Sequence, residues 1–284
     1  MLINCETLAQ HLHDPSWVIF DCRHDLVDLA KGERVYREGH IPGAHLANLD
    51  VDLSGGKNGR NGRHPLPSPA SFVAFLARHG VTGQSTVVAY DDVGGQFAAR
   101  LWWLCRWIGL DSAALLDGGI SKWTADGRAL SPTVPPTKTV ALTGHANPDM
   151  AITANQLLSR LPAPGREGCV LIDARTPERF RGDVEPMDPV AGHIPGAVNR
   201  FYKENLNADL TFKSRGELRT AFDALLGGHA PAAVVHQCGS GVTACANIFA
   251  MEYAGLAGAG LYAGSWSEWV SDAARPVAKG AARW

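Results

Sequence analysis

The chain repeats its own sequence once. Four segments recur in the same order in both halves: VIFDCR (18–23) and VLIDAR (170–175), GHIPGA (39–44 and 192–197), STVVAYDD (85–92) and AAVVHQCG (232–239), and LLDGGISKW (115–123) and LYAGSWSEW (261–269). A solenoid repeats at a much shorter period of about 20–50 residues, so this spacing indicates two copies of one domain. The 284-residue chain is long enough for two domains of ordinary size.

Within each copy, short apolar runs alternate with amphipathic segments. The runs WVIF, TVVAY, CVLI and AAVV lack polar alternation, whereas SPASFVAFLARHG and GELRTAFDALLGG place apolar residues at helical spacing and end on glycine. Strands of this kind, separated by helices, are typical of a parallel sheet covered on both faces. The fold class predicted is α/β, with two tandem domains that each contain a mainly parallel sheet and helices on both faces.

The segment between the copies is rich in proline, threonine and glycine. Pro135 and Pro136 can continue neither a helix nor a central strand, which indicates an extended linker. We therefore expect a first domain over 1–135, a linker over 136–149 and a second domain over 150–284.

Composition and charge exclude several classes of protein. The formal net charge of −2 gives no reason to expect nucleic acid or an anionic membrane as partner. No apolar run approaches the roughly 20 residues of a membrane span, and the N-terminus lacks the pattern of a signal peptide. The six cysteines form no CxxC pair, so neither a disulfide framework nor a structural zinc site is expected. These features predict a cytoplasmic protein without a bound metal.

One cysteine lies where an open α/β sheet places its chemistry. Cys238 directly follows the predicted strand AAVVHQ and is followed by Gly-Ser-Gly, which lets the backbone curl. Thr243 is the expected N-cap of a helix that Gly255 ends. Successive loop N–H groups and a helix N-terminus would then converge on the sulfur and stabilise its thiolate.

A reactive thiol in such a loop is compatible with two chemistries. A phosphatase or arsenate-reductase-like enzyme needs an arginine after the loop to clamp a phosphate-like anion, but the sixth position after Cys238 is Ala244. A smaller anion, such as the terminal sulfur of a cysteine persulfide, suits this loop better. A non-catalytic binding module of related fold is disfavoured by Cys238 itself.

These motifs resemble the tandem-domain rhodanese family of sulfurtransferases, and CGSGVTA is similar to the active loop of its 3-mercaptopyruvate sulfurtransferases. The similarity covers nearly the whole chain and includes GHIPGA in both halves, YDDVGGQFAARLWW (90–103) and GSWSEW (264–269). The resemblance implies that the second copy is catalytic and that the first has lost its nucleophile, in agreement with Asp91 at the position of Cys238. It implies no cofactor.

Two donor classes remain open, 3-mercaptopyruvate and thiosulfate. Thiosulfate rhodaneses carry basic residues just after the cysteine, whereas Gly239 and Ser240 are neutral here. Attraction between unit charges about 4 Å apart is about 4 kcal/mol near a protein surface, so missing cations favour the singly charged mercaptopyruvate. The resemblance implies that Arg179 binds the substrate carboxylate, while the family's second arginine is replaced by Met187.

The resemblance also implies a proton relay, because loss of sulfur from mercaptopyruvate leaves a pyruvate enolate. Ser240 would supply the hydroxyl, supported by His64 and Asp52 from the first half. The persulfide would be stabilised by loop N–H groups and then passed to a thiol, thioredoxin-like or cyanide acceptor. The loop residues expected to bind substrate are Gly239, Gly241, Val242 and Thr243.

Overall fold

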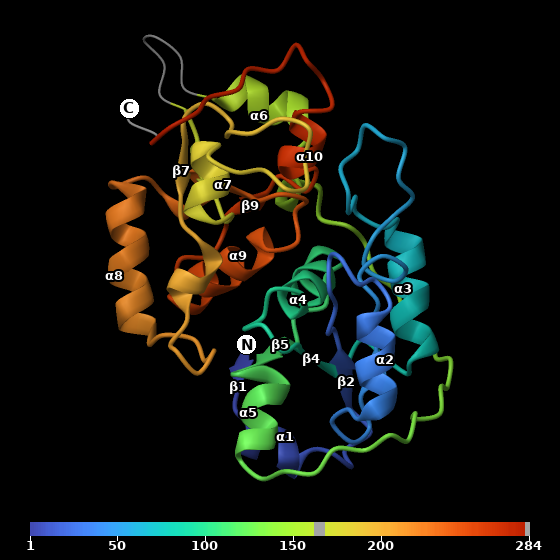
Figure 1. The fold of residues 1–284 in the computed structure, drawn as a ribbon. Helices are drawn as coiled ribbons and strands as arrows, with labels where there is room; N and C mark the ends of the chain where they lie inside the picture. The colour runs from blue at the N-terminus through green and yellow to red at the C-terminus, as the bar shows by residue number, and fades with distance from the viewer. Residues whose placement is uncertain (162–167, 282–284) are drawn as a thin grey trace. The chain divides into compact units, whose positions relative to one another are not determined.

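The computed structural model describes residues 1–161 and 168–281, drawn in Figure 1. The chain divides into two compact units that exchange short segments. The first unit contains residues 1–55, 66–147 and 206–212, and the second contains 56–65, 148–205 and 213–284. The sequence did not predict these exchanges, and one of them brings the segment with His64 into the second unit.

The first unit is built on a five-stranded sheet in the order β1-β5-β4-β2-β3, with every described pair of strands parallel. The strands are β1 (Leu2–Ile3), β2 (Trp17–Asp21), β3 (His45–Leu46), β4 (Thr86–Tyr90) and β5 (Ala113–Leu116). The helices are α1 (Cys5–Gln10), α2 (Lys31–Glu38), α3 (Pro69–Arg78), α4 (Ala98–Trp107) and α5 (Gly119–Ala125). Side chains of α1 and α5 pack on one face of the sheet, and Phe75 of α3 packs against Phe20 on the other.

The second unit repeats this plan with a parallel four-stranded sheet in the order β7-β6-β8-β9. Its strands are β6 (Val170–Asp173), β7 (Ala197–Asn199), β8 (Val234–Gln237) and β9 (Gly260–Leu261). The α-helices are α6 (Ala154–Arg160), α7 (Pro177–Arg181), α8 (Arg215–Leu226), α9 (Ala244–Tyr253) and α10 (Ser265–Trp269). Short 3₁₀ turns form η1 (Pro148–Met150), η2 (Tyr202–Asn205) and η3 (Pro231–Ala233).

One core of the second unit contains Leu157 of α6, Phe180 of α7 and Trp266 of α10, packed on Leu171 and Val235. The central strands β6 and β8 are buried along their whole length. This explains why their sequences show no polar alternation. The predicted α/β class and the parallel sheets are confirmed. No helix in the described part of the chain is long and apolar enough to cross a membrane.

The repeated sequence motifs have the same contacts in both units. Arg23 bonds Asp21 and the carbonyl of Gly39, and Arg175 bonds Asp173 and the carbonyl of Gly192 in the same way, at 2.7 Å to each carbonyl. The histidine of each GHIPGA motif stacks on an aromatic ring. The ring centroids of His40 and Tyr36 are 4.0 Å apart in the first unit, and those of His193 and Phe180 are 3.9 Å apart in the second. Because these contacts also occur in the first copy, which has Asp91 in place of Cys238, they hold loop geometry.

Candidate active site

Cys238 lies at the carboxyl edge of the second sheet. It directly follows β8, whose last residue Gln237 pairs with Asp173, the last residue of β6. Open parallel sheets bind ligands at this edge. The cysteine is 2% exposed, and residues 239–243 form the loop that leads from it to α9.

Ser265 holds the cysteine backbone in place. The N–H of Cys238 donates to Ser265 Oγ at 3.0 Å, and the Ser265 hydroxyl donates to the carbonyl of Tyr262 at 2.9 Å. Ser265 is fully buried with a φ of 53°, a left-handed conformation that costs a non-glycine residue about 1–2 kcal/mol. The residue was missed from the sequence, although the internal repeat places Gly119 opposite it. This difference between the copies, a serine in the second and a glycine in the first, was the signal that could have pointed to Ser265.

The loop after Cys238 turns at Gly241. Gly241 has a φ of 77°, and a methyl group there would collide with the backbone carbonyl of Ala263. The next helix begins at Ala244, with Thr243 at the N-cap position and Val242 buried beside it. The Thr243 side chain makes no capping hydrogen bond, because its backbone is already helical rather than extended.

Ser240 and His64 are brought together although 176 residues separate them. His64 Nδ1 lies 2.8 Å from Ser240 Oγ, and both side chains are buried. Asp52 belongs to the first unit, where its Oδ2 accepts the N–H of Asn48 at 2.9 Å. Burial raises the pKa of the Asp52 carboxyl above its usual value. The part of Asp52 in a relay stays a prediction.

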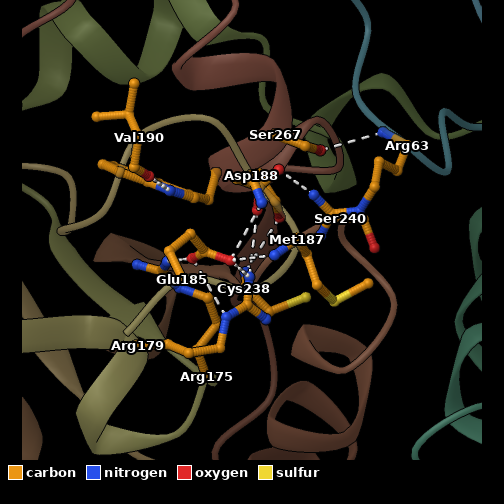
Figure 2. Close-up of polar contacts among 12 residues, drawn as sticks. Arg63, Arg175, Arg179, Glu185, Met187, Asp188, Val190, Cys238, Ser240 and Ser267 are labelled. Carbon is orange, nitrogen blue, oxygen red and sulfur yellow. Dashed lines mark hydrogen bonds and ion pairs between the residues drawn. The ribbon is translucent and has the colours of Figure 1, made fainter. Parts of the chain in front are cut away.

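Arg179 is anchored by two buried carboxylates. Its Nη2 lies 2.7 Å from Glu185 Oε1 and 3.2 Å from Asp188 Oδ2, and its Nε lies 3.2 Å from Glu185 Oε2 (Figure 2). Glu185 also accepts the N–H groups of Met187 and Asp188, so it organises the segment that contains these two residues.

A second guanidinium comes from Arg63, which the sequence analysis missed. Arg63 pairs with Asp188, and its backbone N–H donates to Ser267 Oγ at 3.1 Å (Figure 2). Its Nε is buried and has no hydrogen-bond partner among the described residues. The sequence did contain a signal for Arg63. It directly precedes His64, so a cation lies on the same segment as a member of the predicted relay.

Gly239 lies directly beside both guanidinium groups. A methyl group at this position would lie 2.8 Å from Arg63 Nη2 and 3.4 Å from Arg179 Nη1. The sequence suggested that no cation lies near the neutral loop. The structure shows instead that two guanidinium groups lie beside it. Arginines from two other segments occupy the space that a side chain at 239 would fill.

The matching loop of the first unit shows how such a turn surrounds an anion. The buried carboxylate of Asp91 accepts N–H groups from Val93, Gly95, Phe97 and Ala98 at 2.8–3.0 Å. Burial raises the pKa of this carboxyl, while the four donors oppose that shift. The first copy thus carries its own anion where the second carries Cys238.

Comparison with known proteins also finds two copies of one domain in this chain. The family model "Rhodanese-like domain" matches the chain twice, over residues 4–126 and 153–272. The chain belongs to the rhodanese family. The first match contains β2 to β5 of the first sheet, and the second contains the whole second sheet.

Named relatives in this family include two kinds of sulfurtransferase. The chain is 47% identical to a probable 3-mercaptopyruvate sulfurtransferase of Pseudomonas aeruginosa, with 98% of each sequence covered. It is 40% identical to a putative thiosulfate sulfurtransferase of Mycobacterium tuberculosis, over 93% of this chain and 91% of that one. The solved 3-mercaptopyruvate sulfurtransferase from Leishmania major superposes with a TM-score of 0.82 at 29% identity, over 95% of this chain and 74% of the other.

Proposed function

We propose that this member of the rhodanese family moves sulfur from 3-mercaptopyruvate to an acceptor through a persulfide on Cys238. The observation that carries the proposal is the hydrogen bond between His64 and Ser240, two residues beyond that cysteine. Breaking the C–S bond of mercaptopyruvate leaves an enolate that must gain a proton, so a hydroxyl linked to an imidazole suits this donor. Thiosulfate needs no such proton delivery at carbon.

The first half-reaction forms an S–S bond and breaks a C–S bond. The Cys238 thiolate attacks the donor sulfur, and the electron pair of the C–S bond passes to the pyruvate fragment. Ser240 would give its proton to the enolate carbon and regain one from His64. Pyruvate leaves, and a persulfide remains on Cys238.

The second half-reaction regenerates the enzyme. A thiolate acceptor, such as a thioredoxin-like protein, or cyanide attacks the outer sulfur, and the electron pair of the S–S bond returns to Cys238. No cofactor takes part. We expect this chemistry to take place in the cytoplasm.

Arg63 and Arg179 are proposed to bind the carboxylate of the donor. Both guanidinium groups lie beside Gly239, the residue after the nucleophile, and an arginine can hold a carboxylate with two parallel hydrogen bonds. Arg63 would thus take the part of the family arginine that Met187 replaces. The backbone N–H groups of Gly239, Gly241, Val242 and Thr243 are proposed to stabilise the persulfide, by analogy with the donors around Asp91.

Thiosulfate is the second candidate donor, since the two arginines supply the positive charge that the loop lacks. Steady-state turnover of both donors by the unmodified protein, with an aryl phosphate as a third substrate, decides between them. We expect the higher kcat/KM for mercaptopyruvate and no turnover of the phosphate ester. A higher kcat/KM for thiosulfate would overturn the proposal.

The relay gives a prediction that separates the donors. His64→Gln and Ser240→Ala are each expected to lower kcat for mercaptopyruvate by about 10²–10³-fold, the usual contribution of positioned acid–base groups. Persulfide formation from thiosulfate should change by less than about tenfold, because it needs no protonated carbon. Single-turnover kinetics with each donor measures both effects.

The matched control is His229→Gln, because His229 is an exposed histidine that lies before β8 and outside the loop of residues 239–243. It should behave as the unmodified protein with either donor. Equal losses with both donors in the His64 and Ser240 variants would show that these residues shape the loop rather than deliver a proton.

A further inference from the structure

Asp188 bridges the two guanidinium groups that are proposed to receive the donor. One carboxylate oxygen pairs with Arg63, and the other lies 3.2 Å from Arg179 Nη2 (Figure 2). The Asp188 side chain is 3% exposed, whereas those of Arg63 and Arg179 are 25% and 16% exposed. A carboxylate between two arginines beside Gly239 has the chemistry of the donor's own carboxylate.

The charges around the loop are balanced before any donor binds. Arg175 pairs with Asp173, Arg179 with Glu185, and Arg63 with Asp188. An entering anion therefore meets no net positive charge while all three pairs remain intact. The buried negative charge of Asp188 repels an entering anion, and the electrostatic penalty is about twice as large for a dianion as for a monoanion.

The two acidic residues of this segment differ in what they hold. Glu185 bonds Arg175, Arg179 and the backbone N–H groups of Met187 and Asp188, so it keeps the segment in shape. The Asp188 side chain makes its described contacts only with Arg63 and Arg179. Its loss would remove the carboxylate that the two guanidinium groups share and leave the anchoring contacts of Glu185 in place.

We propose that Asp188 determines donor specificity by competing with the donor for Arg63 and Arg179, and that it favours singly charged donors over dianions. The inference rests on the proposed function for its biological meaning, but the competition itself concerns anion binding. Asp188 does not touch the reacting sulfur and is a specificity residue rather than a catalytic one.

Asp188→Asn tests the proposal, because it removes the charge and keeps the shape of the side chain. Calorimetric titration should show binding of inorganic sulfate strengthened by about tenfold and binding of pyruvate by about threefold, since the dianion senses twice the charge. In turnover, kcat/KM for thiosulfate should rise relative to that for mercaptopyruvate. Unchanged or weaker sulfate binding would overturn the proposal.

Two further variants complete the test. Asp188→Glu keeps the charge and should keep weak sulfate binding, whereas a gain equal to that of Asp188→Asn would contradict the role of charge. Asp183→Asn removes a charge from the same segment, at an exposed residue paired with Arg181, and should leave sulfate binding unchanged. A gain there would show a long-range charge effect and overturn the proposal.

The titrations also separate this inference from the proposed function. If the unmodified protein fails to turn over mercaptopyruvate, the proposed function is wrong, while the sulfate and pyruvate titrations still decide whether Asp188 competes with anions.

Discussion

Cys238→Ser is expected to reduce sulfur transfer from mercaptopyruvate by roughly 10⁴-fold or more, the scale on which loss of a nucleophile acts. A hydroxyl in place of the thiol cannot accept sulfur as a persulfide, and a serine hydroxyl is scarcely ionised at neutral pH. The substitution changes little else, because the backbone N–H of residue 238 keeps its bond to Ser265. Steady-state turnover with cyanide as acceptor measures the loss.

Cys245→Ala is the matched control for this experiment. Cys245 is a second buried thiol, in the first turn of α9, and its Sγ lies 3.4 Å from the carbonyl of Gly241. It is expected to keep most of the turnover. Sulfur transfer that survives in Cys238→Ser, or that is lost equally in Cys245→Ala, would remove Cys238 from its proposed place as the sulfur carrier.

Gly241→Ala is expected to destabilise the protein by about 2–5 kcal/mol and to abolish most of its activity. The alanine would have to adopt a left-handed backbone, at a cost of about 1–2 kcal/mol, and its methyl group would overlap the carbonyl of Ala263. Relief of a backbone overlap in a packed interior costs about 1–3 kcal/mol more and would shift the loop that carries Ser240. Urea unfolding monitored by tryptophan fluorescence measures the stability change.

Gly255→Ala separates the two parts of this cost. Gly255 has a φ of 83° but open space where a methyl group would lie, so only the conformational cost of about 1 kcal/mol applies. Activity should be retained, because Gly255 lies beyond the far end of α9. If Gly241→Ala were no more destabilising than Gly255→Ala, the described packing of the loop against Ala263 would be wrong.

The fold could be predicted because local and repeated signals agree. The buried strands β6 and β8 begin with apolar residues, and α8 ends before Gly227, as its sequence pattern indicates. The duplicated GHIPGA and Asp-Arg motifs make equal contacts in both units, so the repeated sequence corresponds to repeated structure. These features depend on neighbours close in the chain.

The charge of the site could not be predicted in the same way. The sequence shows neutral residues after Cys238, but the guanidinium group of Arg63 reaches the loop from a segment 175 residues away that packs in the second unit. Ser265 was missed for a similar reason, since a left-handed serine is recognised only when its backbone conformation is known. The pairing of Ser240 with His64 was implied by the family resemblance rather than by spacing.

The central claim is that Cys238 carries the transferred sulfur, and intact-protein mass spectrometry after brief exposure to 3-mercaptopyruvate tests it most directly. We expect the protein to gain the mass of one sulfur atom, located on Cys238 after proteolysis and removed by cyanide, with no gain in Cys238→Ser. A protein that releases pyruvate without gaining sulfur, or that gains it on another cysteine, would contradict the account.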